Sequence, residues 1–270
     1  MSATKLARLR QNDAAIGAAA IRAATSGYPR PVVAVMNQST VITDAAVQAM
    51  TAALQIQVTR DFAPLWFTGA NLVFVPKGAT PPAGAMRIVM LDTTDQAGAL
   101  GYHDLGPDGE PQGLVFAKTT QQFGLSPTVT ASHELLEMLA DPAIDRLFGV
   151  LTYQGVQACV ACEVGDPVEA DALGYVINGV RVSDFVTPAY FHPGAAGPYS
   201  FGRHVSFPMV LAPGGYQSYL PITTGGWKQV TAEAAPGMSM APGNPRTEPQ
   251  RGSRREKRIR GHEHWARSTR

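Results

Sequence analysis

The segment 132–141 places one histidine and two glutamates at a helical spacing that suits a metal ion. His133 and Glu137 are four residues apart, so on a helix both side chains project from one face and can bind one cation. Glu134 follows His133 directly and would accept a proton from a water molecule at that cation. Both glutamates lie in an otherwise apolar stretch, where burying an unpaired carboxylate would be costly. We therefore expect a metal site here rather than a solvated Glu-x-x-Glu face.

A third protein ligand must come from another part of the chain, because catalytic zinc uses three protein ligands and one open position. The candidate stretch is 161–169, in which Glu163 follows Glu137 by 26 residues and Asp166 follows three residues later. One of these carboxylates would bind the metal and the other would orient a ligand. The spacing alone leaves open which of them is the third ligand.

These motifs resemble those of a known family, the glutamate-type zincins. In that family a His-Glu-x-x-His helix is followed by a glutamate ligand and then by an aspartate that orients a ligating histidine. More narrowly, Ser-His-Glu-x-x-Glu followed by Glu-Val-x-Asp is similar to exordium-like plant proteins and to related bacterial and phage proteins described as peptidases. The resemblance covers about residues 32–170.

The resemblance implies a role for each matching residue. His133, Glu137 and Glu163 would bind the metal, Glu134 would be the general base, and Asp166 would orient the His133 ring. The departure is Glu137, which stands where the family has its second histidine. One imidazole with two carboxylates makes a harder, more anionic site than two imidazoles with one carboxylate. Zinc remains the favoured ion, and manganese or calcium would also suit this ligand set.

The implied activity is that of a metal-dependent peptidase acting on peptide or protein substrates. Glu134 would take a proton from water, the resulting nucleophile would attack a peptide carbonyl, and the proton would pass to the leaving nitrogen. An oxyanion donor would also be needed. Tyr190 and His192 are the expected catalytic donors, and His204 and His103 are further candidates, although each of the four also fits a purely structural role.

The C-terminal segment 246–270 carries nine basic and three acidic residues, a net charge of +6, while the rest of the chain carries 13 − 18 = −5. A basic cluster in this tail could bind nucleic acid or an acidic partner through salt-dependent attraction, although such tails are more often simply solvated. The cluster comprises Arg254, Arg255, Lys257, Arg258 and Arg260. The tail favours a second hypothesis, a non-catalytic structural or binding protein, such as a virion-associated one, that retains a zincin-like fold.

The helices and strands expected around these residues indicate an α+β fold with a zincin-like mixed sheet. A helix is expected from Thr43, and the metal-binding helix is expected to begin near 126–130 and to stop at Asp141-Pro142. Asn178-Gly179 predicts the turn of a later hairpin. The expected strands of the first part are apolar runs at 31–36, 71–76, 86–91 and 113–117, with a hairpin turn at 106–111.

Composition changes divide the chain into four expected parts. These are an N-terminal extension (1–28), a lobe with the metal-binding helix (29–147), a loop-rich C-terminal lobe (148–230), and a linker with the basic tail (231–270). The extension is interpreted as an amphipathic surface helix rather than an export signal. Cys159 and Cys162 are interpreted as small buried residues that support the loop bearing Glu163, rather than as a redox pair or half of a zinc knuckle.

No run approaches the roughly 18 apolar residues of a membrane span, so we expect no membrane segment and a cytoplasmic or virion-associated protein. The sequence indicates no particular oligomeric state.

Overall fold

The computed structural model describes residues 30–94, 99–151, 155–236 and 238. The chain divides into two compact units, Met1–Pro31 and Val32–Arg270, and the account below concerns the second. The predicted N-terminal helix and the basic cluster of the tail lie outside the described residues. The described part combines helices with a mixed sheet and antiparallel sheets, which confirms the α+β class.

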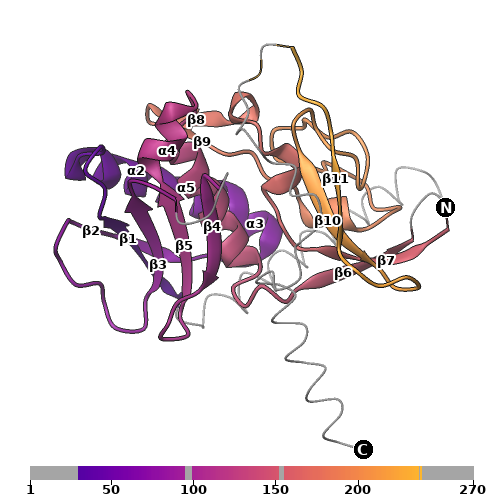
Figure 1. Ribbon diagram of the computed structural model, residues 1–270, viewed down its shortest axis with the longest axis horizontal. Coiled ribbons are helices and arrows are strands. Elements are labelled where there is room, and N and C mark those ends of the chain that lie inside the picture. Colours follow the sequence, from indigo (N-terminus) through magenta and orange to yellow (C-terminus); the bar gives the residue numbers. More distant parts are fainter. Residues whose placement is uncertain (1–29, 95–98, 152–154, 237, 239–270) are drawn as a thin grey trace, which may run out of the picture. The chain divides into compact units, whose positions relative to one another are not determined.

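A five-stranded mixed sheet forms the first layer, with the strand order β2-β1-β3-β5-β4 (Figure 1). Four of its strands are parallel, and β4 is antiparallel to β5 at the end of this order. The hairpin expected around 106–111 is thereby confirmed. The strands are β1 (Val32–Asn37), β2 (Asn71–Val75), β3 (Met86–Leu91), β4 (Gly101–Leu105) and β5 (Pro111–Phe116).

Both faces of this sheet are buried at its centre. Along β1, Val33 and Val35 belong to the large core shared with the helices, whereas Ala34 and Met36 join a second apolar cluster. A parallel strand buried on both faces reads as a continuous apolar run rather than an alternating one. This explains the unbroken apolar composition of 32–36.

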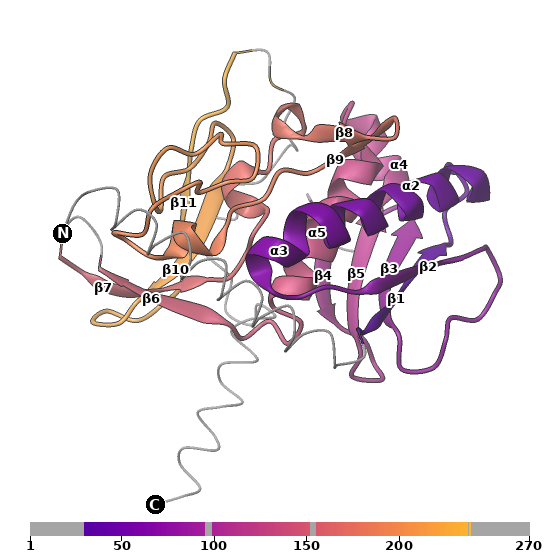
Figure 2. The same cartoon turned by 180° about the vertical axis from the view of Figure 1, so that it is seen from behind.

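Helix α2 (Asp44–Ile56) begins where Thr43 caps it, since the Thr43 hydroxyl accepts the N–H of Ala46 at 3.2 Å. The chain continues through a π-helical segment, η1 (Gln57–Phe62), into the short helix α3 (Ala63–Trp66). Helices α2 and α5 lie on the same face of the five-stranded sheet (Figure 2). The π-helical segment was not predicted.

Helix α5 (Pro127–Ala140) carries the metal-binding motif and is buried along almost its whole length. Pro127 occupies its first turn, where a missing backbone N–H costs nothing. The helix stops at Asp141, whose side chain accepts the N–H groups of Asp145 and Arg146 at 3.0 Å each. The predicted helix end is confirmed. Because α5 contacts β4 and β5 and also β9, its polar side chains are enclosed by protein.

The remaining elements belong to the same compact unit as the first sheet. A four-stranded antiparallel sheet has the order β11-β10-β7-β6, and β8 and β9 form the hairpin predicted at Asn178-Gly179, where both turn residues have positive φ. No helix in the described residues is both long and apolar enough to cross a membrane. The further bounds are α4 (Ala117–Gln122), β6 (Leu147–Leu151), β7 (Gln157–Ala161), η2 (Asp166–Val168), η3 (Asp171–Leu173), β8 (Tyr175–Ile177), β9 (Val180–Val182), η4 (Pro188–Phe191), β10 (Tyr216–Pro221) and β11 (Lys228–Thr231).

Candidate metal centre

Helix α5 and the turn after β7 bring together one histidine and two carboxylates. His133 Nε2 lies 3.3 Å from Glu137 Oε2 and 3.3 Å from Asp166 Oδ1. Ligands bound at about 2.05 Å to a tetrahedral zinc ion lie about 3.3 Å from one another. Both carboxylate oxygens therefore lie at ligand spacing from the imidazole nitrogen, and the three residues, with ligand atoms within 4.8 Å of one another, form a group that could hold one ion.

The Glu137 carboxylate is fixed by the backbone of this turn. Its Oε1 accepts the N–H of Gly165 at 3.0 Å and the N–H of Asp166 at 3.3 Å. The other oxygen, Oε2, is directed toward the imidazole of His133. Because the backbone holds one oxygen, the second is presented in a defined direction for a ligand.

Gly165 allows the turn to approach the His133 ring closely. A Cβ at this position would lie 2.7 Å from Cε1 and 2.8 Å from Cγ of His133, well inside ordinary contact. The Gly165 backbone is in the right-handed helical region, so glycine is needed here for space and not for its conformational freedom. The sequence Glu-Val-Gly-Asp thus includes a residue that holds the histidine ring in place.

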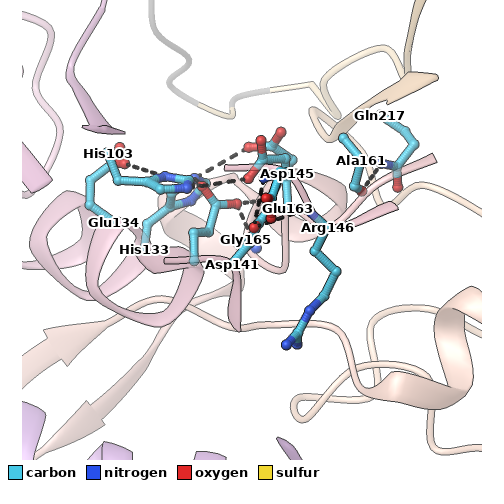
Figure 3. Close-up of polar contacts among 12 residues, drawn as sticks. His103, His133, Glu134, Asp141, Asp145, Arg146, Ala161, Glu163, Gly165 and Gln217 are labelled. Carbon is cyan, nitrogen blue, oxygen red and sulfur yellow. Dashed lines mark hydrogen bonds and ion pairs between the residues drawn. The ribbon is translucent and has the colours of Figure 1, made fainter. Parts of the chain in front are cut away.

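A second imidazole, that of His103 on strand β4, faces the same helix (Figure 3). Its Nδ1 lies 3.6 Å from Glu134 Oε2 and 3.6 Å from Glu137 Oε2. Its Nε2 lies 3.8 Å from Glu163 Oε2. His103, Glu134 and Glu137 form a second group able to hold a cation, and they share only Glu137 with the first group.

The two predicted carboxylates of the turn thus lie beside different histidines. Asp166 accompanies His133 and Glu137, in the position of a third ligand, while Glu163 accompanies His103. The spacing left open which carboxylate is the third ligand, and the position of Asp166 beside His133 and Glu137 favours Asp166. Glu163 is partly exposed, with 15% of its side-chain surface accessible, whereas Asp166 is buried.

Electrostatics in the cluster are dominated by carboxylates. Burial lowers the pKa of His133, but the charge of Glu137 and the close contact with Asp166 outweigh it and hold that pKa well above its ordinary value. The pKa of His103 is likewise raised against the effect of burial by Glu134, Glu163 and Glu137. Burial and then the charge of Asp166 raise the pKa of Glu137 to about 8. These directions show an excess of negative charge, which a divalent cation would offset.

Two tyrosines border the cluster. Tyr190 is completely buried, and its hydroxyl has no hydrogen-bond partner among the described residues. Burial and then the charge of Asp166 raise the pKa of Tyr190. Tyr216, on β10, has a pKa raised by burial and by Asp166, Glu169 and Glu137, so it too lies near the carboxylates. The sequence analysis named Tyr190 as a site residue but missed Tyr216, because no sequence motif near Tyr216 indicated a role in the site.

The other two proposed donors lie in different surroundings. His192 is exposed, and its described contact is an edge-on packing against the ring of Phe148. His204 Nδ1 lies 2.8 Å from the buried carboxylate of Asp184. Within the described residues, the structure brings neither ring into contact with His133 or His103.

A buried hydrogen-bond network supports the start of the motif. Ser132 donates to Gln57 Oε1 at 2.7 Å and accepts the N–H of Ser183 at 3.0 Å. Gln57 in turn donates to the Ser183 carbonyl at 2.9 Å and to the Tyr175 hydroxyl at 3.2 Å. Sequence reasoning missed this network, because its members are separated by 51 to 126 residues and no local pattern links them.

No protein-family model, curated protein or solved structure matches this chain. The resemblance to zincins therefore rests on the motif residues themselves.

Proposed function

We propose that this chain is a metal-dependent hydrolase that cleaves peptide bonds, with zinc as the favoured ion. The observation that supports this most strongly is the spacing of His133, Glu137 and Asp166: both carboxylates lie 3.3 Å from His133 Nε2, and the three ligand atoms lie within 4.8 Å of one another in a buried setting. A divalent cation held by these atoms would polarise a carbonyl group and make a bound water molecule more acidic. The three residues leave one position of a tetrahedral ion for water or substrate.

In this proposal Glu134 accepts the proton of the attacking water. It follows His133 directly on α5 and is 5% exposed, so it acts in surroundings from which bulk water is largely excluded. The Tyr190 hydroxyl, which has no protein partner in the described part, is the proposed donor to the developing oxyanion. Asp166 serves as a ligand here, while the peptide substrate is inferred from the resemblance to zincins.

The test is hydrolysis of an unfolded protein substrate by the full chain supplied with zinc. We expect Glu134→Gln to keep a cation at His133 but to lower the rate by roughly 10²–10⁴-fold, the usual contribution of a general base. Glu233→Gln, at an exposed glutamate, is the matched control and should hydrolyse at the rate of the unaltered chain.

Undiminished hydrolysis in the Glu134→Gln protein would refute the proposed role of Glu134. Binding of zinc without hydrolysis of any peptide substrate would instead favour the second hypothesis, a non-catalytic binding or structural protein that keeps the metal site.

A further inference from the structure

We propose that the cluster holds two divalent cations, with Glu137 as the shared ligand and His103, Glu134 and Glu137 as the second site. This inference rests on the proposed metal centre and extends it: Glu134 would bind the second cation through Oε2, which faces His103, and would accept the proton of the attacking water through Oε1. The two groups contain one imidazole each, and the ring nitrogens of both approach the same oxygen, Glu137 Oε2, at 3.6 Å and 3.3 Å.

The donor atoms at His103 are farther apart than those at His133, so a cation bound there would have slightly longer bonds to its ligands. Donor atoms 3.6 Å apart, as Nδ1 is from both Glu134 Oε2 and Glu137 Oε2, correspond to tetrahedral bonds of about 2.2 Å, at the upper end of the zinc–carboxylate range. Harder ions with longer bonds to oxygen, such as manganese, also suit two carboxylates and one imidazole. The ligand atoms of these three residues, from β4 and α5, lie within 4.8 Å of one another.

The other nitrogen of His103 lies near a carboxylate that could orient the ring. Such a histidine usually directs its second ring N–H at a carboxylate, which fixes the ring and makes it a stronger ligand. His103 Nε2 lies 3.8 Å from Glu163 Oε2, which is longer than a hydrogen bond, so a shift of about 0.8 Å would let Glu163 accept this N–H once the ring is bound through Nδ1. This gives Glu163 a positioning role at the second site.

Glu137 is suited to bridge the two positions. Two cations that share one carboxylate oxygen lie about 3.5–4 Å apart, as in known two-metal sites. The N–H groups of Gly165 and Asp166 bind Oε1, which leaves Oε2 directed at both rings. A freely rotating glutamate would not present one oxygen in this way.

Formal charge also favours two cations over one. The carboxylates that contact the two imidazoles are those of Glu134, Glu137, Glu163 and Asp166, and together they carry a formal charge of −4. With both imidazoles neutral, two divalent ions would neutralise these carboxylates, whereas one ion would leave −2, or −1 with His103 protonated. Arg146, which follows the helix, directs its guanidinium away from the rings (Figure 3).

The test is the zinc stoichiometry of the full chain, first freed of metal by a chelator and then loaded with zinc chloride and separated from excess ion. We expect two ions per chain in the unaltered protein and one in the His103→Ala protein. His103→Gln, which keeps a side chain of similar length, should show the same fall from two to one if alanine disturbs folding. His192→Ala is the matched control, since its ring packs on Phe148, and should retain two ions.

Manganese loading gives a second readout, because two ions that share a carboxylate show a spin-coupled paramagnetic resonance spectrum. We expect that spectrum in the unaltered chain and the spectrum of isolated ions in both His103 variants. One ion in all of these proteins would overturn the second site and leave the proposed centre at His133 intact. Two ions retained after loss of His103 would also overturn it, while no ion in the unaltered chain would refute both proposals.

Discussion

Replacing Gly165 with alanine tests whether the turn after β7 holds the His133 ring in its metal-binding position. The new Cβ would lie 2.7 Å from His133 Cε1, whereas carbon atoms pack at about 3.5 Å. The ring atom nearest to this Cβ is Nδ1, which lies closer still, so the ring or the turn must move by at least about 0.8 Å. The backbone at Gly165 already has right-handed helical angles, so alanine adds no conformational strain there and its effect comes from this contact alone.

We expect two measurable consequences of Gly165→Ala. Overpacking of this size should lower the free energy of unfolding by about 1–3 kcal/mol. The displaced ring would no longer keep Nε2 at 3.3 Å from Glu137 and Asp166, and zinc affinity should fall by roughly 10–100-fold, as when a residue that supports a metal ligand is changed. Affinity is measured by competition with a chromogenic chelator, and stability by urea unfolding of the metal-free chain.

Gly149→Ala is the matched control, because a Cβ at Gly149 on β6 meets no atom within 4 Å. It should leave zinc affinity unchanged. A Gly165→Ala protein that binds zinc as tightly as the unaltered chain would refute the claim that this close approach positions His133.

Two further changes test the surroundings of the site, and a third tests the stability of the fold. Ser132→Ala removes the acceptor of the buried Ser183 N–H and should cost about 1–3 kcal/mol in urea unfolding, so unchanged stability would show that the network does not support the helix. Tyr190→Phe removes a buried hydroxyl without a described partner and should keep or raise the melting temperature of the metal-free chain; a lower one would reveal a partner. Hydrogen bonds from the Ser39 hydroxyl and from Thr40 lower the pKa of Asp92 to about 2. The contribution of Asp92 to the free energy of unfolding is therefore complete above about pH 4 and is lost as the pH falls toward 2. The difference in unfolding free energy between the unaltered chain and Asp92→Asn should therefore shrink over that range, and a constant difference would contradict this.

Local chemistry explains which parts of the fold could be predicted. Thr43 begins α2, Asp141-Pro142 ends α5 and Asn178-Gly179 turns the β8–β9 hairpin, each through residues that act within a few positions of themselves. His133 and Glu137 share a helix face for the same reason. Long apolar runs likewise predicted the buried strands of the first sheet.

The parts of the site that could not be predicted depend on the tertiary fold. The sequence named His103 only as a candidate oxyanion donor, and its place beside the α5 carboxylates depends on β4 turning back beside β5 in the hairpin. Its sequence environment, Gly-Tyr-His-Asp, carries no sign of this neighbour. The arrangement of Glu163 beside His103 and Asp166 beside His133 is set by the path of a single turn, which the spacing of the carboxylates does not define.

The measurement that tests the central claim most directly is the metal content of the purified full chain, compared with that of the His133→Ala and Asp166→Ala proteins. We predict that the unaltered chain contains a bound divalent cation at His133. Both changes should reduce binding there, because each removes a donor that lies within a ligand spacing of the others. A chain that contains no metal, and acquires none when zinc or manganese is added, would contradict the account.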